Sequence, residues 1–196
     1  MAICGIDEAG RGPIAGPMVF AGVIFKFQVS SSKFQETWFK DLTDSKKLTA
    51  KKREELFEII KENSIYHIVF KSNDEIDEKG LSKCIKESLI EIKKTLKADK
   101  YLFDGNSSFG IEGIETIIKG DEKIKEISAA SILAKVSRDR FMIDISKKYP
   151  EYKFDKHKGY ITKEHKKLIE KYGLCEIHRK SYKLKPSTPS LFEGLI

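Results

Sequence analysis

The sequence is poor in cysteine and contains no long apolar run. Its three cysteines, Cys4, Cys84 and Cys175, include no pair at Cys-x-x-Cys spacing. This argues against a disulfide framework and a zinc site, and favours a reducing cytoplasm. We expect all three to be small buried or half-buried apolar residues. No apolar stretch approaches the ~18 residues of a membrane span, and the N-terminus lacks a secretory signal pattern. We therefore expect a cytoplasmic protein with no membrane partner.

What the sequence does contain is material for one core and a localised excess of positive charge. The 196 residues are 40% hydrophobic, enough for one domain or one core with a small appendage. The formal net charge is +7, and residues 147–185 hold thirteen Lys or Arg against five Asp or Glu. Such a basic segment favours an anionic polymer as partner, with a solvated lysine-rich surface as the alternative.

Apolar runs and turn residues predict strands that alternate with helices after an initial hairpin. We expect strands over residues 2–7, 17–27, 65–70, 101–103 and 116–118, and helices over 49–62, 81–96, 126–147 and 162–172. This order is typical of the α/β class with a mixed sheet. We expect residues 1–150 to form the core, with a basic, mostly helical segment over 151–196 packed on it.

Three aspartates stand out because each follows a short apolar run. They are Asp7, Asp104 and Asp121, and Glu8 adds a fourth carboxylate beside the first. Sites in α/β sheets form beyond strand ends, and clustered carboxylates repel one another unless a cation neutralises them. Oxygen ligands of this kind suit Mg²⁺ or Mn²⁺. The alternative is that each is a turn or cap residue, as we expect for Asp74.

A set of motifs resembles the ribonuclease HII family. Residues 4–13 read CGIDEAGRGP, followed by AGP at 15–17, which is similar to the opening motif of that family. Its later motifs follow in order: DSKKL at 44–48, FDG at 103–105, KGD at 119–121, SAASILAKV at 128–136, RDR at 138–140, HKGY at 157–160 and HRKSY at 178–182. The resemblance spans residues 2–182.

The resemblance implies a ribonuclease H-like fold with a five-stranded mixed sheet flanked by helices. It implies an endonuclease that hydrolyses the RNA strand of RNA–DNA hybrids and cuts at single ribonucleotides embedded in duplex DNA. It further implies that the four acids Asp7, Glu8, Asp104 and Asp121 form the catalytic site, with two Mg²⁺ or Mn²⁺ ions in the active complex. Two-metal-ion hydrolysis gives 5′-phosphate and 3′-hydroxyl ends.

Recognition of the ribonucleotide is implied for Gly10, Arg11, Gly12 and Tyr160. The glycines let the backbone approach a ligand, whereas a tight turn is the alternative. Three lysines are candidate phosphate contacts, although any lysine can simply be solvated: Lys46, Lys119 and Lys158. Asp139 lies in a matching motif, and we expect it on a helix surface or paired with a neighbouring arginine. We expect His157, His165 and His178 to be structural.

Two alternatives to a ribonuclease HII remain at this point. One is a non-catalytic nucleic-acid-binding module, which would gain nothing from four carboxylates near a phosphate. The other is an enzyme similar to ribonuclease HIII, whose extra N-terminal domain finds no room before a motif that begins at Cys4. We expect a monomer. Residues 183–196 match no motif. For Leu191 and Phe192 the alternatives are packing on the core and docking on a partner. We favour packing, because no Gln stands at the spacing that a sliding-clamp-binding motif needs.

Overall fold

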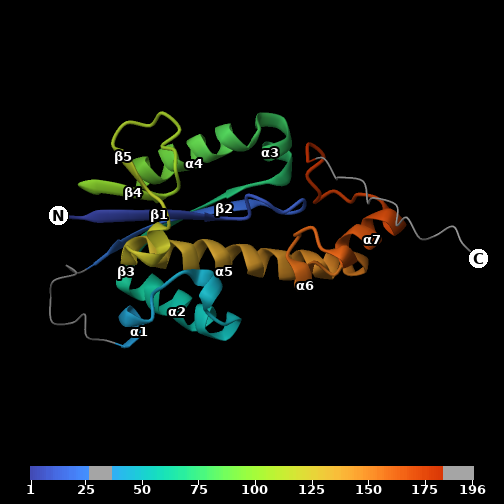
Figure 1. The fold of residues 1–196 in the computed structure, drawn as a ribbon, viewed down its shortest axis with the longest axis horizontal. Helices are drawn as coiled ribbons and strands as arrows, with labels where there is room; N and C mark the ends of the chain where they lie inside the picture. Colours follow the sequence, from blue (N-terminus) through green and yellow to red (C-terminus); the bar gives the residue numbers. More distant parts are fainter. Residues whose placement is uncertain (27–36, 183–196) are drawn as a thin grey trace, which may run out of the picture.

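A single mixed sheet forms the centre of the protein. The computed structural model describes residues 1–26 and 37–182 (Figure 1). Its strands are β1 (Ile3–Ala9), β2 (Met18–Phe25), β3 (Ser64–Lys71), β4 (Lys100–Asp104) and β5 (Ile114–Ile117). The strand order is β3-β2-β1-β4-β5. β2 runs antiparallel to β1 and β3, whereas β1, β4 and β5 are parallel. The predicted five-stranded mixed sheet is confirmed.

β1 is longer than its apolar run predicts. The run indicates an end at Asp7, but pairing with β2 continues through Glu8 with Phe20 and Ala9 with Val19. Every residue of β2 is buried, and its apolar run extends the pairing with β1 beyond Asp7. Asp7 and Glu8 therefore lie within a strand, where the backbone is held in place by pairing.

Helices cover both faces of the sheet. They are α1 (Thr37–Lys40), α2 (Ala50–Asn63), α3 (Asn73–Lys79), α4 (Leu81–Thr95), α5 (Lys125–Lys148), α6 (Phe154–His157) and α7 (Lys163–Tyr172). Short 3₁₀ turns are η2 (Ser45–Lys47), η3 (Gly120–Glu122) and η4 (Pro150–Tyr152). α3 and α4 lie on one side of the sheet and α5 with α2 on the other (Figure 1).

Each face of the sheet is sealed by its own apolar cluster. On the α4 side, Cys84, Ile85 and Leu89 pack against side chains of β1 and β2. On the other side the small residues at the start of α5 let the helix lie close to the sheet. A Cβ on Gly5 would stand 2.2 Å from the carbonyl carbon of Glu126, so only glycine fits where α5 crosses β1. This close packing sets the first turns of α5 beside the acids of β1.

Helix starts follow capping chemistry, with one correction. Thr49 caps α2, as its position predicts, and the structure shows that Thr162 caps α7. The expectation that Asp74 caps a helix is wrong, because Ser72 does so instead. The Ser72 hydroxyl accepts from the N–H of Glu75, and the Glu75 carboxylate accepts in return from the N–H of Ser72. Asp74 lies in the first turn of α3.

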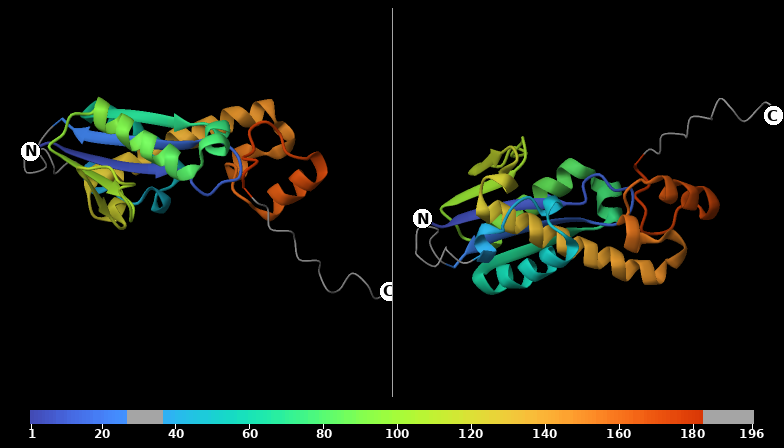
Figure 2. Two further views of the ribbon diagram at one scale, coloured as in Figure 1. Left: turned by 90° about the horizontal axis from the view of Figure 1, so that it is seen from above. Right: turned by 60° about the horizontal axis from the view of Figure 1, so that its bottom comes forward.

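The C-terminal part packs at one end of the sheet, as two views show (Figure 2). Tyr152, Phe154 and Ile169 form a cluster with Ile14 and Met142. Residues 173–182 form no regular helix but return to the segment between β1 and β2, where His178 forms an isolated bridge with Ala15. The division at residue 150 stays a prediction, and residues 183–196, with Leu191 and Phe192, lie outside the described residues.

Two expectations about composition can be compared with the structure. Cys4 and Cys84 are buried, Cys175 is half-buried, and all three are free. Within residues 1–26 and 37–182, no helix is long and apolar enough to cross a membrane.

Candidate functional site

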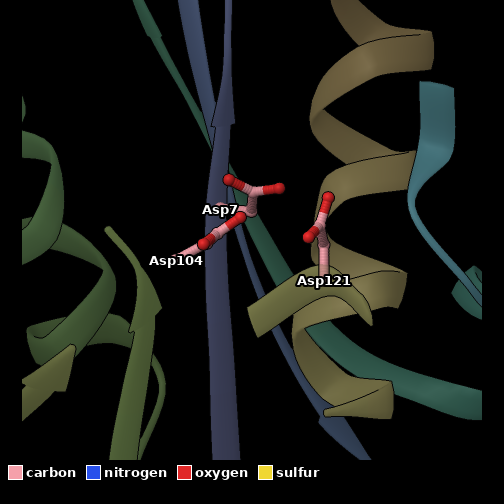
Figure 3. A group of neighbouring side chains, drawn as sticks. All are labelled: Asp7, Asp104 and Asp121. Atoms are coloured by element: carbon pink, nitrogen blue, oxygen red, sulfur yellow. The ribbon is translucent and has the colours of Figure 1, made fainter. Parts of the chain in front are cut away.

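Three aspartates from separate segments meet beside the parallel strands β1 and β4. Ile6 pairs with Phe103 across these strands, so Asp7 and Asp104 are neighbours. Asp121 comes from η3, and Figure 3 shows the three carboxylates turned toward a shared space. Carboxylate oxygens of Asp7, Asp104 and Asp121 all lie within 4.8 Å of one another. The sequence predicted these three as neighbours, and the structure brings them together.

Hydrogen bonds to the backbone hold η3 in place. The Ser128 hydroxyl, on the first turn of α5, donates to the carbonyl of Asp121 over 2.5 Å. The N–H of Gly120 donates to Asp104 Oδ1 over 3.1 Å. These contacts connect the third aspartate both to α5 and to the end of β4.

Glu8 lies beside the three aspartates but outside their group. Its Oε1 pairs with Arg11 Nη2 at 2.8 Å, while its Oε2 is buried and has no hydrogen-bond partner among the described residues. A buried carboxylate oxygen without a partner is costly unless a further group binds it. This oxygen is therefore available to a cation or a ligand.

Burial and repulsion by neighbouring acids disfavour the charged forms of Asp7, Glu8 and Asp121. Burial raises the pKa of Asp7 well above its ordinary value, and Glu8, Asp104 and Asp121 raise it further. Burial raises the pKa of Glu8 to about 7 against the opposing charge of Arg11. Burial, then Asp104 and Asp44, raises the pKa of Asp121 to about 6. A bound cation would remove this penalty.

The donor set fits a hard divalent cation. Carboxylate oxygens are the ligands that such cations prefer, and no His or Cys joins the group of three within the described chain. Repulsion among the acids and the orphaned Glu8 oxygen both indicate that positive charge is needed at this point.

Two further groups near the acids come from the DSKKL segment. Burial opposes the charge of Lys46, but Asp44, Asp121, Asp7 and Asp104 together raise its pKa. Asp44, which the sequence analysis did not single out, also raises the pKa of Asp121. Its place in the DSKKL motif is the signal that could have identified Asp44 as a site residue. Without that motif, an aspartate in a loop cannot be distinguished from a helix cap. Asp44 does cap η2.

Asp7, Glu8 and Asp104 share one cavity of about 570 Å³ with the glycine loop, whereas Asp121 is not among its lining residues. Its described lining includes Asp7, Glu8, Asp104, Gly10, Arg11, Gly12, Lys46, Ser131, Lys135 and Tyr160. Ala9 and Ser45 complete the twelve described lining residues, of which eight were predicted as site residues from the sequence. Ser131 and Lys135 stand four residues apart on α5 and thus on one helix face, so period alone could have added Lys135.

Gly10 and Gly12 have different roles in the loop. Gly10 has φ +95, and a Cβ there would stand 2.1 Å from Arg138 Nε. Gly10 is therefore required by its conformation and by its close packing. Nothing lies within 4 Å of the Cβ position of Gly12 among the residues described, so space is free there for a ligand. Turn formation explains the first glycine but not the second.

The comparisons with known proteins cover almost the whole chain. The family model for ribonuclease HII matches residues 4–185. A ribonuclease HII of Sulfurovum sp. is 52% identical over 191 residues, which is 97% of this chain and 96% of that protein. The chain belongs to the ribonuclease HII family. It is a divalent-metal-dependent endoribonuclease of the ribonuclease H type, a family that acts on RNA–DNA hybrids. This membership decides against a non-catalytic binding module.

Solved structures agree with this assignment. The ribonuclease HII of Archaeoglobus fulgidus, solved in a complex with PCNA, superposes with a TM-score of 0.79 at 27% identity. The match covers 96% of this chain and 98% of that one. The ribonuclease H2 of Pyrococcus horikoshii superposes with a TM-score of 0.75 at 27% identity, over 93% of this chain and 94% of that one. The ribonuclease H-like fold is confirmed.

In this ribonuclease HII, Tyr160 stands at the edge of the cavity that holds the acids. It is 45% exposed, and its ring lies over the buried Arg138 guanidinium, 5.7 Å from centroid to carbon. Its N–H donates to the carbonyl of His157, and its carbonyl accepts from His165 Nδ1. These two hydrogen bonds fix the backbone of Tyr160, and its ring is left partly exposed to solvent.

Two of the three predicted lysines lie outside this cavity. Lys119 is the residue before η3, with φ 55, and does not line it. Lys158 lines a neighbouring cavity of about 290 Å³ with Lys156 and Arg53, and its Nζ donates to the carbonyl of Asp155. Lys135 lines both cavities, so the two adjoin at this residue. Of the three, Lys46 alone lies with the acids.

The three histidines are buried, in keeping with a structural role. The rings of His157 and His165 stack at 4.1 Å between centroids, and His165 Nε2 lies 3.1 Å from His178 Nε2. Burial lowers the pKa of His165 to about 4 and lowers the pKa of the other two. These side chains join the C-terminal part to the backbone of Tyr160.

Proposed function

We propose that this ribonuclease HII hydrolyses the RNA strand of RNA–DNA hybrids and also cuts duplex DNA at single embedded ribonucleotides. The observation that carries the proposal is the shared cavity. It joins Asp7, Glu8 and Asp104 to the loop of Gly10, Arg11 and Gly12, and one carboxylate oxygen each of Asp7, Asp104 and Asp121 lies within 4.8 Å of the other two. A phosphate bound at the acids through a cation would place the adjoining sugar near that loop.

The acids Asp7, Asp104 and Asp121 would hold the metal, with Glu8 contributing its free oxygen. We propose Mg²⁺ or Mn²⁺, two ions in the active complex, because the donors are all carboxylates. When bound, such ions lower the pKa of a coordinated water and stabilise charge on the leaving oxygen. The products would carry 5′-phosphate and 3′-hydroxyl ends.

Other residues of the cavity orient the nucleic acid. Lys46 would place positive charge beside the phosphate, where its own pKa is raised by the acids. The loop would offer backbone donors to the ribose, and the exposed ring of Tyr160 would press on the sugar from the opposite side. The 2′-hydroxyl is not the attacking group in this chemistry, so it is free to be recognised.

The neighbouring cavity extends the same interface. Lys156, Lys158 and Arg53 would contact phosphates away from the cut, because their cavity adjoins the first at Lys135. These contacts would add affinity without reading the sugar. We propose that the protein acts as a monomer in the cytoplasm.

The test is the position and chemistry of the cut. A DNA duplex with one ribonucleotide is incubated with Mg²⁺ or Mn²⁺, and the products are resolved at single-nucleotide length. We expect one cut beside the ribonucleotide, a 3′ end that a polymerase extends and a 5′ end that a ligase joins. Asp144→Asn, an exposed aspartate on α5 paired with Lys147, is the matched control for acid replacement. A 2′,3′-cyclic phosphate product would contradict the proposal.

A further inference from the structure

A buried arginine from the far end of the chain binds the back of the glycine loop. Arg179 is 2% exposed. Its guanidinium donates to the carbonyls of Gly16 over 2.9 Å, of Arg11 over 3.1 Å and of Gly10 over 2.6 Å. It also donates to the Tyr182 hydroxyl at 3.0 Å. The charged guanidinium is therefore hydrogen-bonded to uncharged oxygens, and three of these are backbone carbonyls of residues 10–16.

Tyr182 adds a second contact to the same loop. Its hydroxyl accepts from Arg179 and donates to the carbonyl of Arg11 over 2.7 Å. The carbonyls of Gly10 and Arg11 are consequently both bound from behind, by groups that do not line the cavity.

Binding the carbonyls also decides where the amides point. Peptide units are planar and, in the described chain, all trans, so the C=O of one residue and the N–H of the next point in opposite directions. With the carbonyls of Gly10 and Arg11 turned toward Arg179, the N–H groups of Arg11 and Gly12 face away from it. Among the described residues, neither N–H donates to a protein acceptor. Both residues line the cavity, so these two donors are available to a ligand bound there.

The positive charge does more than orient these amides. A cation hydrogen-bonded to a carbonyl polarises that peptide unit, and hydrogen bonds in a chain strengthen one another. The N–H groups of Arg11 and Gly12 therefore become stronger donors. Arg179 is itself held in place, because its N–H donates to the carbonyl of Ile14 and the Asp77 carboxylate accepts from the N–H groups of Lys180 and Ser181.

We propose that Arg179 and Tyr182 are positioning residues for ribonucleotide recognition. They hold the loop so that the amides of Arg11 and Gly12 are aimed at the ribose in the cavity and are polarised as donors. This inference rests on the proposed function of the loop. It adds a specificity role for two residues more than 160 positions away in sequence.

The test compares substrates that depend on the loop to different degrees. A duplex with one ribonucleotide offers a single 2′-hydroxyl, whereas a long RNA–DNA hybrid is also held by its shape. The variants are Tyr182→Phe and Arg179→Lys. Tyr152→Phe is the matched control, because its hydroxyl donates to the carbonyls of Tyr172 and Gly173, away from the loop. For each protein, kcat/KM is measured on both substrates, and Tm is measured alongside.

We expect Tyr182→Phe to lower the ratio of kcat/KM, single ribonucleotide over hybrid, about three- to tenfold, the effect of one weakened hydrogen bond. Arg179→Lys keeps the charge but not the fork, so its ratio should fall further. Tyr152→Phe should leave the ratio unchanged even where its Tm falls. Tyr182→Phe keeps the test decisive if Arg179→Lys does not fold.

The outcomes separate this inference from the function on which it rests. If the wild-type protein cuts the single-ribonucleotide duplex but Tyr182→Phe leaves the ratio unchanged, or lowers both substrates equally, the positioning role is wrong. If the wild-type protein fails to cut that duplex at all, the proposed function is wrong and this inference falls with it.

Discussion

Asp139 pairs with Lys135 one helical turn earlier, at 2.7 Å, and does not join the group of Asp7, Asp104 and Asp121. The expected arginine partner lies farther off, since Arg53 Nη2 is 4.0 Å away and comes from α2. The pair places Asp139 in the neighbouring cavity and leaves Asp121 as the acid that completes the group. This relationship separates two acids that both lie in family motifs.

The first prediction concerns the four acids. Asp7→Asn, Glu8→Gln, Asp104→Asn and Asp121→Asn should each lower single-turnover cleavage at least ~10²-fold while duplex binding largely survives, because they act on the transition state. Cleavage and binding are measured on the same duplex. Asp139→Asn is the internal comparison. If that variant were inactive and Asp121→Asn kept near-normal turnover, the assignment of the fourth acid would be wrong.

The second prediction concerns the stability of the metal-free protein. The pKa of Asp7 is raised on folding, so its ionisation destabilises the folded state above the ordinary carboxyl pKa. In EDTA, Asp7→Asn should therefore raise Tm by at least about 2 °C, roughly the effect of 1 kcal/mol at this size. The gain should be larger at pH 8 than at pH 5, since the pKa of Glu8 is about 7 and its charge then adds repulsion.

The complementary experiment measures Tm after a divalent cation is added. Mg²⁺ or Mn²⁺ should raise Tm of the wild-type protein and raise it much less in Asp7→Asn, because binding stabilises only the state that binds. A lower Tm for Asp7→Asn in EDTA would show that the acids do not repel as described.

The third prediction concerns Tyr160. Tyr160→Ala should lose more activity on a duplex with one ribonucleotide than on a long RNA–DNA hybrid, because the hybrid retains shape recognition. Turnover is compared at saturating metal. Tyr160→Phe keeps the ring over Arg138 and removes only the hydroxyl. It therefore distinguishes the contribution of the ring from that of the hydroxyl. Equal losses on the two substrates would mean that Tyr160 supports the site generally.

The fourth prediction concerns the neighbouring cavity. The double variant Lys156→Ala with Lys158→Ala should reduce the dependence of log affinity on log salt by about 0.9 for each phosphate that the variant no longer neutralises. The double variant Lys147→Ala with Lys148→Ala removes the same charge from the exposed end of α5, where both lysines pair with acids. An unchanged slope in the first variant would remove Lys156 and Lys158 from the interface.

The elements that could be predicted from the sequence are those with a local signal. Apolar runs indicated all five strands, and the capping residue Thr49 indicated the start of α2. The continuation of β1 past Asp7 could not be seen, because it depends on the register with β2. Asp74 was misplaced because Ser72 and Glu75 form a reciprocal cap.

The site shows the same division. Asp7, Asp104 and Asp121 follow apolar runs, Glu8 stands next to the first of them, and the family motifs added the loop. Arg179 and Tyr182 could not be found by spacing, because their contacts with Gly10 and Arg11 join the two ends of the described chain. Lys119 and Lys158 carry no signal that distinguishes them from other lysines, and neither lies in the cavity with the acids.

The most direct test of the central claim, that acids and loop act together on one ribonucleotide, is a comparison of four reactions. The wild-type protein is given the same duplex with either one ribonucleotide or its deoxy counterpart, each with Mg²⁺ or with EDTA, and the fraction cut is measured. The account predicts cutting only where both the cation and the 2′-hydroxyl are present. Cutting of the all-deoxy duplex, or cutting in EDTA, would contradict it.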